Sequence, residues 1–252
     1  MTIQVGERIL ITGASSGIGE GLARHFAAQG CHLALCARRI DRLTQLRTAL
    51  LQQHAGLKIS VHALDVTDAQ AVFVEFQSAR AAHGGLDRII VNAGIGDGRR
   101  IGTGHQDANR HTVEVNFLAA LTQCEAAVQI FRAQKAGHLV TIASMSAVRG
   151  MPRHLTAYAA AKAGLVHLTE GIRAELLATP IRVSCILPGY IRTELNANAP
   201  RMLAEVDAIT GARLIARAIA REPAQACVPA WPWQPLGWLM RHLPLRLVAR
   251  MV

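Results

Sequence analysis

The chain has 252 residues, 51% of them hydrophobic, and a formal net charge of +10 at pH 7. This length and apolar content exclude a disordered chain and favour one large α/β domain around a single core. The basic residues, nearly all arginine, are scattered, and few aromatic residues accompany them, so the charge does not indicate nucleic-acid binding.

The cysteines, the histidines and the apolar runs argue against a disulfide-bonded, a metal-dependent and an exported or membrane-spanning protein. The five cysteines are widely spaced without a C-x-x-C pair, which predicts buried, reduced thiols. The eleven histidines show no metal-site spacing with a third ligand, so we expect no catalytic metal. The first residues carry an acid and a base before any apolar run, and no stretch reaches 18 uncharged apolar residues. We therefore expect a cytoplasmic protein.

Short apolar runs alternate with longer helical patterns, which predicts strand–helix units and a parallel sheet. Residues 8–12 (RILIT) are expected to form a buried strand, followed by a glycine-rich turn and a helix over 20–29 closed by Gly30. Such a turn brings backbone N–H groups and a helix N-terminus to a pyrophosphate. The turn residues expected to bind a dinucleotide are Gly13, Ser15, Ser16, Gly17, Ile18 and Gly19.

The second strand, 32–37, is followed by Arg38 and Arg39. A carboxylate at this point would hold the ribose 2′-hydroxyl of NAD, whereas an arginine accommodates the 2′-phosphate of NADP. The sequence therefore favours NADP(H) over NAD(H). The alternative is a solvated basic turn leading into the helix expected over 40–54.

The next two strands also end in residues suited to ligand binding. The strand 58–64 leads to Asp65 and Val66 and then to a helix over 68–83, and the strand 86–91 leads to Asn92, Ala93 and Gly94. Both endings lie at the carboxyl edge of the sheet, where such folds bind ligands. Small residues there allow a cofactor to lie against the backbone.

A long helix is expected over 107–131, after a loop at 94–104 that contains glycine and arginine. It carries Asn116 in its apolar middle. A buried amide needs hydrogen-bond partners, which a functional network or an ordinary core interaction would supply. The sequence leaves both interpretations open.

The fifth strand, 138–143, leads to Ser144, and a helix with Tyr158 and Lys162 follows. A spacing of four puts these two side chains on one helix face, about 5–6 Å apart. Moving the phenol pKa from near 10 to neutrality requires about 4 kcal/mol, more than one ammonium supplies. A second positive charge, such as an oxidised nicotinamide ring, is therefore expected nearby.

The last strand recognised, 181–187, ends in Pro188 and Gly189, followed by Ile191 and Thr193. Residues 196–204 show no clear pattern and are interpreted as a lid over substrate. Residues 226–252 form a short apolar extension with three tryptophans and several prolines, after a domain expected over 1–225. The extension is interpreted as packing on its own domain or a neighbouring subunit, with a substrate lid and peripheral membrane contact as alternatives.

Together these motifs resemble the short-chain dehydrogenase/reductase family over roughly residues 6–230. The resemblance rests on residues 12–19 (TGASSGIG), Asp65 with Val66, residues 92–94 (NAG), Asn116, Ser144, Tyr158 with Lys162, and Pro188 with Gly189. It implies a single domain with a three-layer, Rossmann-like, doubly wound parallel sheet of about seven strands. It also implies a homodimer or homotetramer.

The resemblance assigns roles to individual residues. It implies that Tyr158 is the general acid/base and that Lys162 lowers its pKa and holds the nicotinamide ribose. Ser144 would hydrogen-bond the reacting oxygen, Asn116 would support a water-linked proton path, and Thr193 would hold the carboxamide. Pro188, Gly189 and Ile191 would line the cofactor site.

One position departs from the family pattern. The family's serine usually lies thirteen residues before the tyrosine, where this chain has Met145, with Ser144 and Ser146 on either side. Residues 141–144 (TIAS) look like the strand ending that delivers this serine. We therefore assign Ser144, with one extra residue between Pro152 and Tyr158, and keep Ser146 as the alternative.

The predicted function is an NADP(H)-dependent oxidoreductase that acts on an alcohol or carbonyl compound, which the apolar tail suggests is lipophilic. The alternative is a dinucleotide-binding regulator or scaffold without turnover. Such a protein would not need Tyr158 and Lys162 together.

Overall fold

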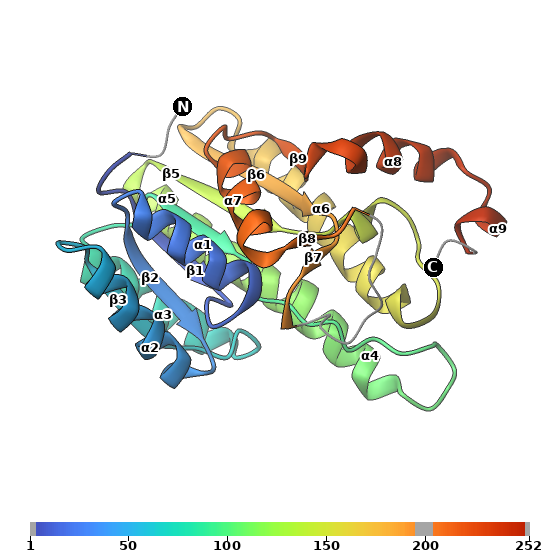
Figure 1. Cartoon of the computed structure of the whole chain (residues 1–252), viewed down its shortest axis with the longest axis horizontal. Helices are drawn as coiled ribbons and strands as arrows, with labels where there is room; N and C mark the ends of the chain where they lie inside the picture. Colours follow the sequence, from blue (N-terminus) through green and yellow to red (C-terminus); the bar gives the residue numbers. More distant parts are fainter. Residues whose placement is uncertain (1–3, 195–203, 250–252) are drawn as a thin grey trace.

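The computed structural model describes residues 4–194 and 204–249. Seven parallel strands form one sheet in the order β3-β2-β1-β4-β5-β6-β9 (Figure 1). The strands are β1 (Arg8–Thr12), β2 (His32–Ala37), β3 (Ile59–Ala63), β4 (Arg88–Val91), β5 (Gly137–Ile142), β6 (Ile181–Pro188) and β9 (Gln225–Val228). Strand order proceeds in opposite directions from β1 and from β4, so the switch point lies between them. The expected doubly wound sheet is confirmed.

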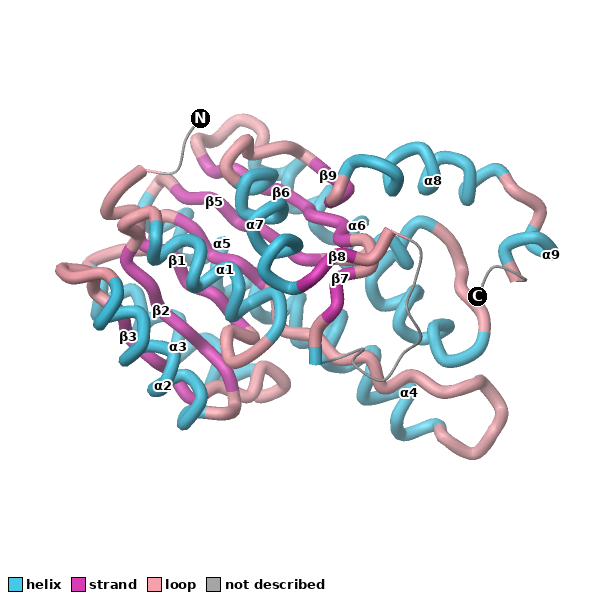
Figure 2. The backbone as a smooth tube through the Cα atoms, in the orientation of Figure 1, coloured by secondary structure: helices cyan, strands magenta, loops and turns pink. Residues whose placement is uncertain are grey.

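Helices cover both faces of the sheet (Figure 2). One face packs against α1 (Gly17–Ala28), α2 (Ile40–Gln53) and α7 (Ala208–Ile219), and the other against α3 (Ala69–His83), α5 (Ala119–Gln134) and α6 (Thr156–Leu176). Neighbouring strand residues alternate between the two layers: Ile9 and Ile11 pack with Phe26, whereas Leu10 packs with Phe76. Because both faces are covered, the inner strands are apolar along their whole length.

The sequence placed most of these elements correctly. β1 and β2 have the predicted bounds, and β3, β4, β5 and β6 differ from them by at most two residues. α1 begins at Gly17, before the expected residue 20. The single helix expected over 107–131 consists of α4 (Gln106–Val113), a π-helical turn η1 (Glu114–Leu118) and α5.

Five strands and helices were not placed by the sequence. These are the short parallel pair β7 (Ile191–Arg192) and β8 (Val206–Asp207), the edge strand β9, and helices α7 and α8 (Ala230–His242). The lid interpreted over 196–204 lies outside the described residues except for Ala204.

The C-terminal segment begins within the main sheet. β9 pairs with β6, so the boundary expected between 225 and 226 passes through a strand of the main sheet. Beyond it, α8 (Ala230–His242) and α9 (Leu245–Val248) continue along the molecule (Figure 1). α8 packs its buried face on the loop after Ser144, while Trp231 and Trp238 are exposed. Among the described residues, no helix combines the length and apolar character needed to cross a membrane.

Candidate active site

The ends of β1 and β4 are joined by side-chain hydrogen bonds. The Thr12 hydroxyl accepts from the N–H groups of Asn92, at 3.0 Å, and Ala93, at 3.2 Å. The Asn92 amide donates to the Thr12 carbonyl at 2.9 Å. These bonds hold the glycine-rich turn against the segment from Asn92 to Gly94. Two of the predicted cofactor segments therefore lie side by side at the switch point of the sheet.

The glycine-rich turn requires its glycines. Gly13 and Gly17 have φ angles of +67° and +56°, in the left-handed region that favours glycine. A Cβ atom on Gly19 would collide with the Gly13 carbonyl and would lie 2.7 Å from the Asn92 amide nitrogen. Helix α1 starts in this turn, so the N–H groups at its N-terminus form a site suited to an anion. The turn therefore fits a pyrophosphate.

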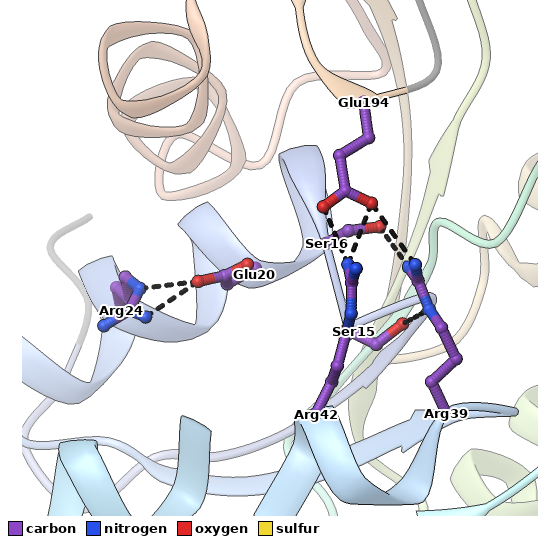
Figure 3. A network of polar contacts seen from close by, with 7 residues as sticks. All are labelled: Ser15, Ser16, Glu20, Arg24, Arg39, Arg42 and Glu194. Atoms are coloured by element: carbon purple, nitrogen blue, oxygen red, sulfur yellow. Dashed lines mark hydrogen bonds and ion pairs between the residues drawn. The ribbon is translucent and has the colours of Figure 1, made fainter. Parts of the chain in front are cut away.

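Polar side chains surround the turn on the side of β2 (Figure 3). Arg39 donates from Nε to the Ser15 hydroxyl at 3.2 Å and from Nη2 to the Ser16 hydroxyl at 2.6 Å. Its Nη1 atom pairs with the Glu194 carboxylate at 3.2 Å, and Arg42 pairs with the same carboxylate at 2.7 Å. Arg39 therefore lies against the glycine-rich turn and joins it to Glu194.

Arg38 is exposed and faces the end of β3. Hydrogen bonds from Thr67 hold the pKa of Asp65 below its usual value, and the charge of Arg38 adds to this effect. The predicted pair of arginines therefore faces two different groups. Arg42 was not predicted from the sequence, although its place three residues after Arg39, in the first turn of α2, would put both on one side of that helix.

Tyr158 and Lys162 lie on one face of α6, as their spacing predicts. The Lys162 Nζ atom is 5.9 Å from the centre of the Tyr158 ring and donates to the Ile142 carbonyl at 3.0 Å. The Lys162 side chain is buried, with a relative exposure of 4%, and burial lowers its pKa to about 8. A buried charge is costly unless it is paired or hydrogen-bonded, and titratable groups perturbed by burial in this way are frequent at functional sites.

Burial raises the pKa of Tyr158, and a hydrogen bond with Ser144 opposes the increase. With the chain's own groups alone, burial is the larger of the two effects, so the net change in the Tyr158 pKa is upward. A phenol tuned toward neutral pH therefore needs a further positive charge, in agreement with the sequence argument.

Ser144 is the serine that hydrogen-bonds Tyr158. It follows β5 and caps the short 3₁₀ turn η2 (Met145–Val148), where its hydroxyl accepts from the Ser146 N–H at 3.1 Å. The segment between Ser144 and α6 contains a second 3₁₀ turn, η3 (Arg153–Leu155). The contact with Tyr158 favours Ser144 over Ser146 as the partner of the substrate oxygen.

Asn116 is fully buried in the π-helical turn η1. Its Nδ2 atom donates to the carbonyls of Ile95 and Thr112, both at 2.9 Å. A Cβ atom on Gly94 would lie 2.7 Å from Asn116 Oδ1 and 3.4 Å from Lys162 Nζ, so these three residues meet at the end of β4. π-helical turns are frequent at functional sites because they change which side chains face inward. The sequence pattern did not indicate this turn.

Most of the remaining predicted residues lie at or after the end of β6. Gly189 lies directly against the Trp233 indole, whose ring also makes an edge contact with Tyr190 at 5.2 Å between centroids. Thr193 lies against Gly17 of the glycine-rich turn. Ile191 is buried in β7, while Ile18 and Val66 pack against the core. The structure thus brings the predicted cofactor residues to one edge of the sheet.

Within the described residues, no group of three His, Cys, Asp or Glu side chains is arranged to hold a metal ion. All five cysteines are free. Burial raises the pKa of the thiols of Cys36 and Cys185. These thiols pack as apolar side chains.

Comparison with known proteins agrees with this geometry. Residues 7–204 match the short chain dehydrogenase family. The chain is 50% identical to an uncharacterized oxidoreductase of Mycobacterium tuberculosis over 97% of this chain and 96% of that one. Among solved structures it resembles levodione reductase, with 25% identity, a TM-score of 0.77, and coverage of 87% of this chain and 91% of that one.

It also resembles an alcohol dehydrogenase from the archaeon Thermococcus sibiricus complexed with 5-hydroxy-NADP, with 25% identity and a TM-score of 0.78. That match covers 88% of this chain and 95% of the other. The family match spans most of the chain and includes the glycine-rich turn, Ser144, Tyr158 and Lys162. The chain therefore belongs to the short-chain dehydrogenase/reductase family, whose members are oxidoreductases that transfer a hydride between a nicotinamide dinucleotide and a small alcohol or carbonyl substrate.

Proposed function

We propose that this enzyme is an NADP(H)-dependent oxidoreductase for lipophilic alcohols or carbonyl compounds, with Tyr158 as its general acid/base. The observation that carries the proposal is the grouping of Ser144, Tyr158 and Lys162 beside Gly94, at the end of the segment that is bonded to the glycine-rich turn. A bound nicotinamide cofactor supplies or accepts the hydride. The chain must orient this cofactor and move the proton.

Proton transfer falls to Tyr158. Carbonyl reduction places negative charge on oxygen, so the substrate oxygen needs a proton donor and a second hydrogen bond. The Ser144 hydroxyl lies close enough to the phenol to oppose the rise in its pKa, so one substrate oxygen would be able to contact both groups. Lys162, buried beside the ring, favours phenolate when it is charged.

The cofactor segments surround this group. We propose that the glycine-rich turn holds the pyrophosphate and that Asn92, Ala93 and Gly94 lie along the nucleotide. Lys162 would hold the nicotinamide ribose, and Asn116 would connect it to a water-linked proton path. Pro188, Gly189, Ile191 and Thr193 would contact the nicotinamide end.

The preference for NADP(H) is inferred from the end of β2. Arg38 and Arg39 stand where an acidic residue would select NAD(H), and Arg39 contacts both Ser15 and Ser16. A guanidinium pairs with phosphate through two parallel hydrogen bonds, a stronger interaction than with a neutral hydroxyl. The solved Thermococcus sibiricus relative, complexed with 5-hydroxy-NADP, supports this reading.

A lipophilic substrate is inferred from the apolar surroundings of Ser144. Met145, directly after it, is buried, and its terminal methyl group reaches Gly237 of α8. Trp233 and Met240 on the same helix are also buried. Apolar side chains next to the catalytic group favour apolar substrates because burial of their surface stabilises binding. Assembly into a homodimer or homotetramer stays a prediction.

The test is a nicotinamide absorbance assay with NADPH and NADH against aromatic, long-chain and short polar carbonyl compounds. We expect turnover with NADPH, at least tenfold higher in kcat/KM than with NADH, and higher for apolar carbonyls than for polar ones. Cofactor binding without turnover on any substrate would instead favour the regulatory or scaffold alternative. Equal use of both cofactors would contradict the NADP(H) preference.

A further inference from the structure

Glu194 is a charged residue that has no role in the catalytic group or in the glycine-rich turn proposed above. We propose that its carboxylate occupies, in the free enzyme, the positions on Arg39 and Arg42 that a cofactor 2′-phosphate would take, and thereby sets how strongly NADP(H) is favoured over NAD(H). This inference rests on the proposed 2′-phosphate role of the β2 arginines. It adds Glu194 and Arg42 as residues that determine cofactor specificity.

The contact is specific in its geometry (Figure 3). Both carboxylate oxygens of Glu194 accept from Arg42 Nη1, at 2.7 and 2.9 Å, and one of them also accepts from Arg39 Nη1, at 3.2 Å. The remaining Arg39 nitrogens are directed to Ser15 and Ser16. One carboxylate thus bridges two guanidinium groups beside the phosphate-binding turn, an arrangement that one phosphate would reproduce.

The fold brings these residues together from distant parts of the chain. Arg39 is the N-cap residue of α2 and Arg42 lies in its first turn, while Glu194 follows β7 and Thr193. Because Thr193 lies against Gly17, Glu194 is carried past the glycine-rich turn to the arginine side. Glu194 directly follows Thr193, which is expected to contact the nicotinamide end of the cofactor. Its carboxylate nevertheless pairs with Arg39 and Arg42, which are expected at the adenosine end.

The ion pairs of Glu194 with Arg39 and Arg42 are weak enough for a stronger anion to displace the carboxylate. Hydrogen bonds from Arg42, then from Arg39, hold the pKa of Glu194 below its usual value, so the group is ionised. All three side chains are about half exposed, at 46% for Arg39, 47% for Arg42 and 59% for Glu194. Ion pairs this exposed contribute at most a few-fold to an equilibrium. A phosphate monoester carries about −1.5 to −2 charges at pH 7 and has the stronger claim on the arginines.

NADP(H) and NAD(H) would affect the contact between Glu194 and the two arginines differently. A 2′-phosphate competes with Glu194 for Arg39 and Arg42, because two guanidinium forks cannot satisfy both anions at full strength. The 2′-hydroxyl of NAD(H) is neutral and leaves the contact in place. Glu194 therefore weakens NADP(H) binding selectively, and its removal should widen the preference.

The experiment is titration calorimetry of the full chain with adenosine 2′,5′-bisphosphate and with 5′-AMP, which separates binding from turnover. Glu194→Gln removes the charge and keeps the shape of the side chain. Glu20→Gln is the matched control, because Glu20 is a partly exposed carboxylate on neighbouring α1 that pairs with Arg24 at 2.7 Å and not with Arg39 or Arg42 (Figure 3). Thermal unfolding of each variant checks that it is folded, and Glu194→Ala serves as a second replacement.

We expect Glu194→Gln to tighten bisphosphate binding by about three- to fivefold, with 5′-AMP binding unchanged within twofold. Glu20→Gln should change neither affinity by more than twofold. An unchanged or weakened bisphosphate affinity in Glu194→Gln would overturn the inference. If the wild-type protein itself binds bisphosphate no tighter than 5′-AMP, the proposed NADP(H) preference fails, and the role of Glu194 fails with it.

Discussion

The Lys162 ammonium lies 5.9 Å from the centre of the Tyr158 ring, while its hydrogen bond goes to the Ile142 carbonyl rather than to the phenol. Ile142 ends β5, two residues before Ser144. The lysine therefore ties the helix that carries the tyrosine to the strand that carries the serine. The ammonium lies over the Tyr158 ring, in a cation–π arrangement.

Ser144→Ala tests the assignment of the catalytic serine. Loss of one hydrogen bond to a developing oxyanion typically lowers kcat by about 10² to 10³. We expect a decrease of this size in steady-state kinetics, with NADPH binding unchanged. Ser146→Ala is the control, since Ser146 contributes its N–H to the Ser144 hydroxyl and this N–H survives the substitution. A larger decrease for Ser146→Ala than for Ser144→Ala would reverse the assignment.

Arg38→Ala tests the 2′-phosphate role of the residue that follows β2. A charge-assisted hydrogen bond is worth about 1.5–3 kcal/mol, so we expect NADPH affinity to fall by roughly tenfold or more. NADH affinity should change by less than threefold, as measured by fluorescence titration. Arg24→Ala, on the exposed side of α1, removes an equal charge as a control. Equal weakening of both cofactors would show that Arg38 contributes general charge and no specific contact.

His138 makes stability depend on pH. Its Nδ1 atom accepts from Arg88 Nε at 3.0 Å, so Nε2 carries the proton shared with Ser184 at 2.8 Å. Burial lowers the pKa of His138 to about 3, with the charges of Arg88 and Arg182 adding to the effect. As pH falls below about 6.5, the unfolded chain takes up a proton that the folded chain takes up only near pH 3. The free energy of unfolding should therefore decrease by up to about 1.4 kcal/mol per pH unit across this window.

Urea unfolding of His138→Asn from pH 7 to pH 4 measures this contribution. The variant keeps an acceptor for Arg88 and should lose less stability on acidification than the wild-type protein, even if it starts lower at pH 7. His167→Asn is the control at an exposed histidine. Parallel pH curves for the wild-type protein and His138→Asn would rule out this source of acid sensitivity.

Helices and strands that are determined by their own local sequence were predicted correctly, whereas those that depend on tertiary packing were not. β1 and β2 were placed to the residue because strands covered on both faces are continuous apolar runs ended by turn residues. β9 is four residues long and partly exposed at the edge of the sheet, so its pattern is too weak to recognise. The π-helical turn at Asn116 is set by packing against the end of β4, which periodicity does not encode.

The candidate site divides in the same way. The glycine-rich turn, Tyr158 and Lys162 are visible because their spacing is fixed within one element. Arg42 and Glu194 meet across 152 residues of sequence, so their pairing depends on tertiary structure. The same holds for Trp233 against Gly189, which joins the C-terminal segment to the end of β6.

The central claim is that Tyr158 transfers the proton that accompanies hydride transfer, and Tyr158→Phe tests it most directly. The variant keeps the ring over Lys162 and removes the hydroxyl alone. NADPH binding and steady-state turnover should be measured on the same preparation. The account predicts NADPH affinity within about threefold of the wild-type value and turnover reduced by at least 10² to 10⁴. Turnover equal to that of the wild-type enzyme, with NADPH bound normally, would contradict it.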